Sequence, residues 1–140
     1  MSAEENKALV QDYIEDVWNQ GNLSRADDLF AADYRRYTAP TAAPLSRDAQ
    51  KQRIAGLRAA FPDVHLTIED LLVEGDRVAF RVTVRGTHQG VFQGIAPTGK
   101  QIVVAALDLV RIENGKLVEH WGGPDLFSAL QQLGAVMSVK

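Results

Sequence analysis

The strongest pattern of hydrophobic positions lies at residues 101–112, a run rich in Val, Ile, Leu and Ala that contains neither Gly nor Pro. Residues of this kind favour a buried strand, and side chains alternate between the two faces of a strand. Asp108 falls in the middle of an apolar row, and the opposite row is largely apolar as well. The first row is Ile102, Val104, Ala106, Asp108, Val110 and Ile112, and the second is Val103, Ala105, Leu107, Leu109 and Arg111.

Asp108 is thus an acidic side chain at a position where an acid is costly. Burying a carboxylate without a partner costs several kcal/mol or raises its pKa, by up to about 3–5 units when the group is fully buried. We therefore expect either a compensating partner or a function for Asp108.

The turn that follows suggests His120 as the partner. Asn114-Gly115 ends the strand, and residues 116–121 resume a strand-like pattern. A two-residue turn would set Asp108 opposite Trp121, whereas a three-residue loop with the glycine as its bulge residue would set it opposite His120. We favour the second register, because Glu-Asn-Gly-Lys suits a type I turn followed by a glycine bulge. It predicts a carboxylate beside an imidazole, a pair that exchanges protons near neutral pH in enzymes and is a structural hydrogen bond elsewhere.

The remaining pattern places helices first and strands after them. Apolar residues recur at helical spacing in the first 60 residues, with Ser2 and Ser46 placed to cap two of the helices, and then alternate at strand spacing. Expected helices cover residues 2–19, 25–32, 46–60 and 126–133, and expected strands cover 34–38, 64–70, 78–85, 101–112 and 116–121. This order predicts a single α+β domain over residues 1–140, with a curved antiparallel sheet wrapped against the N-terminal helices.

The predicted sheet has apolar residues on both faces, so both faces need a cover. The helices supply one cover, and a second copy of the chain is expected to supply the other, as a homodimer formed through the sheet. The sequence alone leaves open which face is which. Candidates for the dimer face are Val103, Leu107, Leu109, Leu117 and Trp121.

Composition narrows the classes of function. The chain has 140 residues, 46% of them hydrophobic and 24% charged, which is typical of a globular domain, and its net charge of −3 argues against binding to nucleic acid or to an anionic membrane. There is no cysteine, which excludes disulfides, thiolate nucleophiles and cysteine-bound metals. Three histidines without short ligand spacing predict no metal site. We see no signal peptide and no membrane-spanning run, so we expect a cytoplasmic protein.

Two stretches of the chain resemble the SnoaL-like polyketide cyclase family, within the nuclear-transport-factor-2-like superfamily. They are GTHQGVFQGIAPTGKQIVV and DLVRIENGKLVEHWGGPDLFSALQQLG, and the EGDRVAFRVTVRG hairpin and the helical start extend the resemblance over essentially the whole chain. The resemblance implies a cone-shaped α+β barrel that encloses a deep apolar pocket, often in a dimer. It also implies an intramolecular aldol reaction without metal or cofactor, in which an acid-base group removes a proton next to a carbonyl.

By position, the resemblance assigns three side chains to the pocket. Asp108 lies where the cyclases place a histidine, His120 lies near the open end of the last strand, and His88 matches a histidine common in the family. The chain departs from the pattern at Gly122, where the cyclases carry their acid-base aspartate. Asp125 lies near that position, either as a substitute acid or as the N-cap of the last helix.

These observations lead to a first hypothesis, a cofactor-free lyase, isomerase or cyclase that acts on a small hydrophobic carbonyl compound such as a polyketide. Asp108 would be the base, tuned by His120, and His88 or Tyr37 would donate a hydrogen bond to the developing oxyanion. Large side chains would shape the pocket or simply pack in the core. The expected substrate contacts are Tyr37, Trp18, Phe61, Phe80, Phe92, Trp121 and Asp125.

Two other hypotheses stay open. The missing acid at Gly122 favours a protein that binds a hydrophobic metabolite without chemistry. An epoxide hydrolase needs an acid and a base on either side of a water molecule, for which Asp70 and Asp108 are available, but no arginine is clearly set between them.

Overall fold

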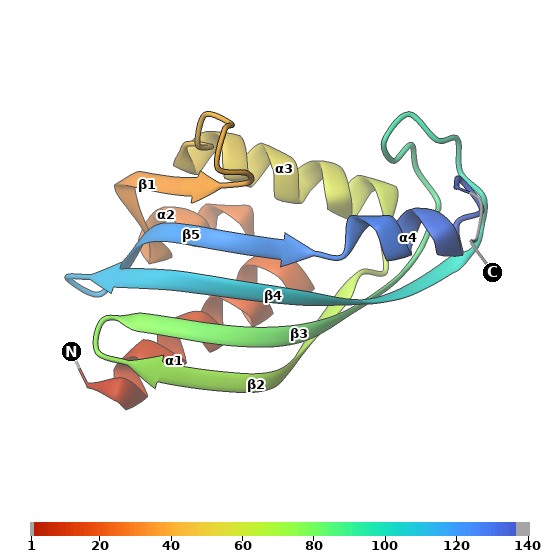
Figure 1. Ribbon diagram of the computed structural model, residues 1–140. Coiled ribbons are helices and arrows are strands. Elements are labelled where there is room, and N and C mark those ends of the chain that lie inside the picture. The colour runs from red at the N-terminus through yellow and green to blue at the C-terminus, as the bar shows by residue number, and fades with distance from the viewer. Residues whose placement is uncertain (1, 137–140) are drawn as a thin grey trace.

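The structure, a computed structural model that describes residues 2–136, has helices packed on one face of a curved five-stranded sheet (Figure 1). The α+β class and the curved sheet agree with the prediction. In chain order the elements are α1 (Ala3–Asp12), the π-helix η1 (Tyr13–Asn19), the 3₁₀ helix η2 (Leu23–Arg25), α2 (Ala26–Leu29), β1 (Phe30–Tyr37), α3 (Arg47–Ala60), β2 (His65–Glu74), β3 (Arg77–Thr87), β4 (Gln101–Glu113), β5 (Lys116–Pro124) and α4 (Leu126–Gln132).

The sheet has the strand order β1-β5-β4-β3-β2. Strands β2 to β5 form an antiparallel meander, as predicted, but β1 pairs with β5 in parallel. The second predicted helix stops at Leu29, because Phe30 is extended and its ring stacks on that of Tyr34, with the ring centroids 4.2 Å apart. The parallel pairing sets Arg36 beside His120 and so brings an early segment of the chain into the site.

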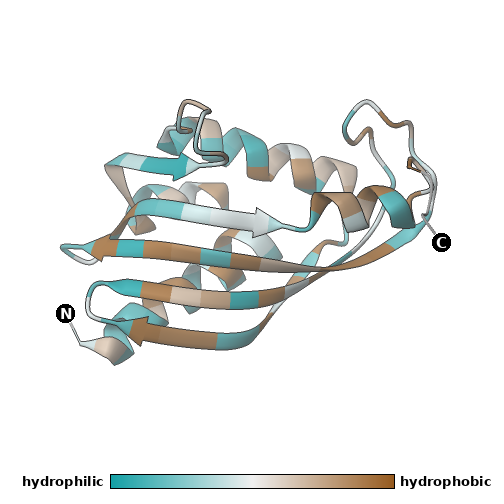
Figure 2. Cartoon of the chain, in the orientation of Figure 1, coloured by the Kyte–Doolittle hydropathy of each residue, from teal (hydrophilic) through white to brown (hydrophobic). Residues whose placement is uncertain are grey.

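The alternation of β4 is as predicted. The row that holds Asp108 faces the helices, and its hydrophobic members are at most 5% exposed: Ile102, Val104, Ala106, Val110 and Ile112. On the opposite face, Val103 is 51% and Leu107 is 65% exposed. Because both faces are apolar, Figure 2 shows β4 as a largely hydrophobic band. Asp108 therefore points into the interior of the protein.

The turn between β4 and β5 differs from the register we favoured. Asn114 and Gly115 form a two-residue turn with φ of 52° and 73°, a conformation that fits the twist of the flanking strands. Val118 is then an extra residue in β5, since Ile112 pairs with Leu117 but Arg111 pairs with Glu119. Asp108 consequently lies opposite Gly122, so both registers weighed from the sequence are wrong, although His120 does lie on the same face as Asp108.

One residue of the dimer face predicted from the sequence, Leu117, was placed wrongly because of this bulge. Leu117 is fully buried, with no exposed surface, so it belongs to the core and not to the outer face of the sheet. Bulging lets Leu117 and its neighbour Val118, which is 8% exposed, both turn away from solvent.

The first helix begins as predicted and then widens. Ser2 caps α1 through a reciprocal pair of hydrogen bonds with Glu5. From Tyr13 onward the helix continues as η1, in which the Gln20 amide donates to the Glu15 carbonyl five residues earlier. This wider turn puts residues five apart on one face, so the Trp18 indole donates to the Tyr13 hydroxyl over 2.9 Å.

Gly122 provides a test of the backbone next to the site. Its φ is +97°, and an added Cβ would lie 2.1 Å from the Leu107 carbonyl oxygen. We expect Gly122→Ala to lower the free energy of unfolding by at least about 1–3 kcal/mol, measured by urea denaturation. Gly56→Ala is the control: Gly56 lies in α3 with no atom within 4 Å of the added Cβ, and this change should stabilise by about 0.5–1 kcal/mol. Unchanged stability of Gly122→Ala would contradict the backbone conformation described here.

Candidate active site

A cavity of about 80 Å³ lies between the helices and the inner face of the sheet. Its wall is almost entirely apolar and includes Ile14, Leu57, Val64, Leu66, Val82 and Val104. The charged and titratable groups that face it come from separate elements: Tyr13 from η1, Arg36 from β1, Arg53 from α3, Asp108 from β4 and His120 from β5. A small set of converging polar groups in an apolar cavity is typical of a ligand site.

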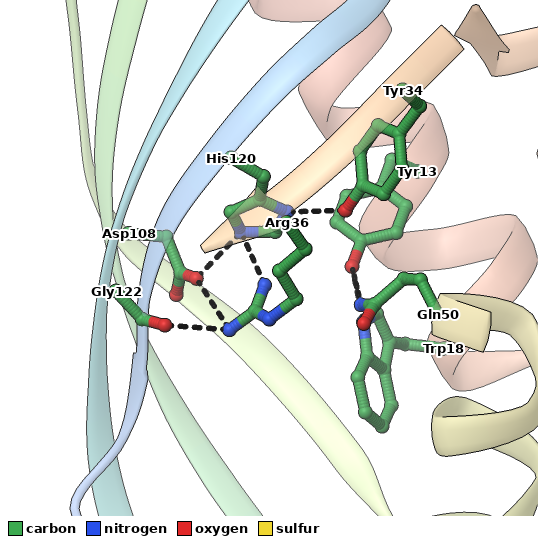
Figure 3. A network of polar contacts seen from close by, with 8 residues as sticks. All are labelled: Tyr13, Trp18, Tyr34, Arg36, Gln50, Asp108, His120 and Gly122. Atoms are coloured by element: carbon green, nitrogen blue, oxygen red, sulfur yellow. Dashed lines mark hydrogen bonds and ion pairs between the residues drawn. The ribbon is translucent and has the colours of Figure 1, made fainter. Parts of the chain in front are cut away.

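Among residues 2–136, Asp108 is the only one that contributes a carboxylate to this wall. Its side chain is 8% exposed, and its Oδ1 lies 2.7 Å from His120 Nε2 and 3.7 Å from Arg36 Nη2 (Figure 3). Within residues 2–136, Oδ2 forms no hydrogen bond. One carboxylate oxygen is thus held by protein partners, and the other is available to accept a proton from a ligand.

Arg36 is the group that compensates the buried charge of Asp108. The residue is only 2% exposed, its Nη2 donates to the Gly122 carbonyl oxygen over 2.6 Å, and its Nη1 lies 2.8 Å from His120 Nε2. Sequence reasoning missed this residue. One signal was available, because Tyr34 and Arg36 lie on the same face of a short extended segment. The residue that Arg36 contacts, His120, lies 84 positions later in the chain, so the sequence did not indicate the contact.

His120 is neutral at neutral pH. Burial lowers its pKa to about 4, and the positive charge of Arg36 acts in the same direction, while the hydrogen bond to Asp108 opposes them. A neutral imidazole carries a single N–H, so Nε2 either donates to Asp108 or accepts from Arg36. The Tyr34 hydroxyl lies 2.9 Å from Nδ1 and takes the complementary role. The position of the imidazole proton therefore decides whether Nε2 bonds to Asp108 or to Arg36.

A second polar group in the cavity wall is the Tyr13 hydroxyl. Its oxygen accepts hydrogen bonds from Trp18 Nε1 at 2.9 Å and from Gln50 Nε2 at 3.5 Å (Figure 3). Burial raises the pKa of Tyr13, so the hydroxyl keeps its proton. Among the described residues that proton has no acceptor, and it is available to a ligand.

The sequence matches one family model over most of its length. The model is described as "SnoaL-like polyketide cyclase" and matches residues 8–133. The chain belongs to the SnoaL-like polyketide cyclase family. The family resemblance seen in the sequence is thus confirmed.

Individual SnoaL-like relatives are similar at low identity. The nogalonic acid methyl ester cyclase of Streptomyces nogalater is 28% identical over 121 residues, which cover 84% of this chain and 90% of that protein. Among solved structures, AclR of Streptomyces galilaeus, a candidate hydroxylase, is 33% identical, with a TM-score of 0.88. The match covers 99% of this chain and 91% of the AclR chain. IdmH of Streptomyces antibioticus, a candidate polyketide cyclase, is 31% identical, with a TM-score of 0.83, and the match covers 92% of this chain and 98% of the IdmH chain.

The structure of this SnoaL-like protein brings most of the predicted site residues together. Asp108 and His120 are in direct contact, as expected, although through a different register. The aromatic side chains predicted to shape the pocket also line the cavity: Trp18, Phe61, Phe80 and Phe92.

Other predicted residues do not line the cavity. His88 is fully buried beside it, where its ring packs on Phe61 and its Nδ1 accepts a hydrogen bond from the Thr98 amide at 3.2 Å. Tyr37 and Trp121 stack on each other with centroids 5.5 Å apart, and Trp121 lines a groove on the outer face because it follows the inward-facing His120.

The two remaining acids are also outside the cavity. Asp125 is exposed and caps α4 by accepting a hydrogen bond from the Ser128 amide at 3.0 Å. The carboxylate of Asp70 is 59% exposed and pairs with Arg81 at 2.7 Å. Asp70 lines the groove on the outer face, to which Asp108 and Arg81 also contribute. The pair of acids that the epoxide hydrolase hypothesis requires is therefore not formed inside the cavity.

Gly122 has a structural explanation in this SnoaL-like chain. It lies opposite Asp108, its carbonyl binds Arg36, and its backbone leaves no room for a side chain against Leu107. The position therefore cannot carry an acid with this backbone, and the acid of the cavity stands instead on the neighbouring strand, at Asp108.

The described residues show neither a metal cluster nor a membrane helix. Residues 2–136 contain no group of three or more His, Asp or Glu side chains arranged to hold a metal ion. Over the same residues, every helix is too short or too polar to cross a membrane.

His120 makes stability depend on pH with a defined sign. Its pKa falls from 6.5 to about 4 on folding, so the unfolded chain binds more protons between these two values. Its contribution is complete above pH 6.5 and is lost as the pH falls toward 4. Between pH 7 and pH 4, we expect wild type to lose on the order of 3 kcal/mol more unfolding free energy than His120→Gln, by urea denaturation.

The matched control for this prediction is His65→Gln, since His65 is exposed. That variant should lose stability in parallel with wild type. A His120→Gln variant with the same pH dependence as wild type would show that the buried imidazole is not neutral in the fold.

Proposed function

We propose that this protein catalyses cofactor-free proton transfer on a small hydrophobic carbonyl compound, as a polyketide cyclase or isomerase. The observation that carries the proposal is the free Oδ2 of Asp108 in an otherwise apolar cavity wall. A carboxylate held in place and shielded from water is suited to act as a general base. Membership of a cyclase family and the cyclase relatives support the same reaction class.

In the proposed step, Asp108 Oδ2 takes the proton from the carbon next to the substrate carbonyl. The electron pair of the C–H bond forms a C=C bond, and the carbonyl oxygen becomes an enolate oxyanion. In a cyclase, the enolate carbon then bonds to a second carbonyl carbon of the same molecule, and Asp108 returns the proton to the new alkoxide. An isomerase returns the proton to another carbon.

One donor in the cavity wall is placed to stabilise the oxyanion. The hydrogen of the Tyr13 hydroxyl is not used in a hydrogen bond among residues 2–136. Removing a single oxyanion donor from an enzyme typically lowers kcat by about 10²–10³. In this proposal Tyr13 replaces His88 and Tyr37 as the oxyanion donor, because Tyr13 lines the cavity and the other two do not.

The size of the cavity favours a small substrate. Its volume of about 80 Å³ is below the roughly 300–1,000 Å³ of sites for drug-sized ligands. A substrate with several fused rings must displace part of the wall. Phe92, from the loop before β4, and Leu126, from α4, are among the wall residues that lie outside the sheet and the N-terminal helices.

The test is loss of proton transfer in Asp108→Asn. Turnover would be measured with nogalonic acid methyl ester and, for small substrates, as deuterium incorporation next to the carbonyl of aryl ketones in D₂O by NMR. We expect a fall of about 10²–10⁴-fold, because the amide cannot accept the proton. Asp70→Asn, which changes an exposed carboxylate, should keep wild-type turnover. Wild-type turnover in Asp108→Asn would exclude Asp108 as the base.

We also propose that the outer face of the sheet forms a homodimer interface. Leu72, Val103 and Leu107 are 70%, 51% and 65% exposed there, and a groove of about 430 Å³ runs between Leu72, Leu107, Leu109 and Trp121. A monomer rarely leaves such an apolar patch in water. A twofold dimer covers the same patch on both copies.

Leu107→Glu should prevent this association, because it places a charge at the centre of the apolar face. Light scattering coupled to size-exclusion chromatography should give a dimer mass for wild type and a monomer mass for the variant. Val91→Glu changes a side chain that is 67% exposed in the loop before β4, and it should remain dimeric. A wild-type protein that stays monomeric at tens of micromolar would rule the interface out.

A further inference from the structure

Arg53 differs from the other arginines of α3. It is half-buried and faces the cavity together with Arg36, Asp108 and His120. Arg47 pairs with Asp27 at 3.7 Å, and Arg58 donates hydrogen bonds to the backbone carbonyls of Trp18 and Asn19. Within residues 2–136, the Arg53 guanidinium forms neither a hydrogen bond nor an ion pair.

The charges around the cavity do not balance. Two guanidinium groups face a single carboxylate, and that carboxylate is already held by Arg36 and His120. Because the buried imidazole is neutral, one positive charge is left over. Burial lowers the pKa of Arg53, and the charge of Arg36 lowers it further, but an arginine side chain remains protonated in proteins. A charge in an apolar wall is unfavourable unless an opposite charge meets it.

We propose that Arg53 binds an oxyanion of the ligand, so that the substrate is a carbonyl compound that either carries a carboxylate or becomes an enolate in the cavity. This inference rests on the proposed function and specifies its substrate class. The oxyanion is either a carboxylate that the substrate carries or the enolate that forms when Asp108 removes a proton. Both present oxygen lone pairs in a plane, which match the planar donor fork of a guanidinium.

The geometry separates two roles within the cavity. Arg36 is occupied by Asp108, His120 and Gly122, so it fixes the base. Arg53, which comes from a helix and not from the sheet, is unoccupied and holds the part of the ligand that is not attacked by the base. A ligand that neither carries nor forms an oxyanion would leave the charge of Arg53 uncompensated.

The experiment compares benzoate with benzamide, two probes of the same shape that differ in charge. Their dissociation constants at pH 7 would be measured by NMR titration on wild type, Arg53→Met and the matched control Arg47→Met. We expect wild type and Arg47→Met to bind benzoate about tenfold or more tightly than benzamide, and Arg53→Met to lose this preference. Arg53→Lys, which keeps the charge, should retain part of it.

A second arm identifies the enolate as the source of the oxyanion. Acetylacetone carries no carboxylate but forms an enolate, whose absorbance reports the fraction ionised. If wild type has no preference for benzoate but increases the enolate fraction of acetylacetone, and Arg53→Met does not, the oxyanion is the one formed in the reaction. If Arg53→Met matches wild type in both arms, the proposal is overturned.

Stability distinguishes a binding role from a structural one. Since the Arg53 charge has no partner, Arg53→Met should unfold at a temperature no lower than wild type. Asp108→Asn should keep the preference for benzoate while losing turnover. Turnover in Asp108→Asn would contradict the proposed function alone, whereas an unchanged probe profile in Arg53→Met would contradict the role of Arg53 alone.

Discussion

The Asp108 carboxylate is held in the interior of the sheet by one guanidinium group, that of Arg36. The two side chains are 8% and 3% exposed, and their closest charged atoms lie 3.7 Å apart. Buried ion pairs contribute little net stability, because the loss of hydration offsets the attraction, and apolar replacements are often as stable. Because apolar side chains would stabilise this part of the core as well, the buried pair points to a function of the Asp108 charge. Several features of the backbone around the pair are adapted to hold it.

Three irregular features of the fold serve this pair. The parallel pairing of β1 with β5 brings Arg36 beside His120, although the two are 84 positions apart. The bulge at Val118 sets the register in which His120 reaches Asp108. Gly122, with its left-handed backbone, offers a carbonyl oxygen to Arg36 and leaves the space opposite Asp108 free of a side chain. Each feature departs from regular sheet geometry within a few residues of the cavity.

Much of the fold and part of the site could be predicted from the sequence. The alternation in residues 101–112 placed Asp108 inside, and the family motifs indicated a cavity. The register failed because Asn-Gly is compatible with both a two-residue and a three-residue hairpin, and the bulge that decides the pairing depends on burial of Leu117 and Val118. Arg36 could not be found because its contacts are made across the sheet with strands far away in the sequence. His88 was wrongly expected to line the cavity, since strand position alone does not say which side of Phe61 a ring occupies.

The wide turn of η1 has a consequence for how the N-terminal helix tolerates change in length. The apolar residues of this helix repeat every four positions, as Leu9, Tyr13, Val17 and as Val10, Ile14, Trp18, which is longer than the 3.6 residues of a regular α-helical turn. In a regular α-helix, residues five apart point about 140° away from each other. In η1 the same spacing brings the Trp18 indole within 2.9 Å of the Tyr13 hydroxyl oxygen. Five positions thus cover the angle that four cover in a regular α-helix, so the segment holds one residue more while its phenol stays in the wall of the cavity.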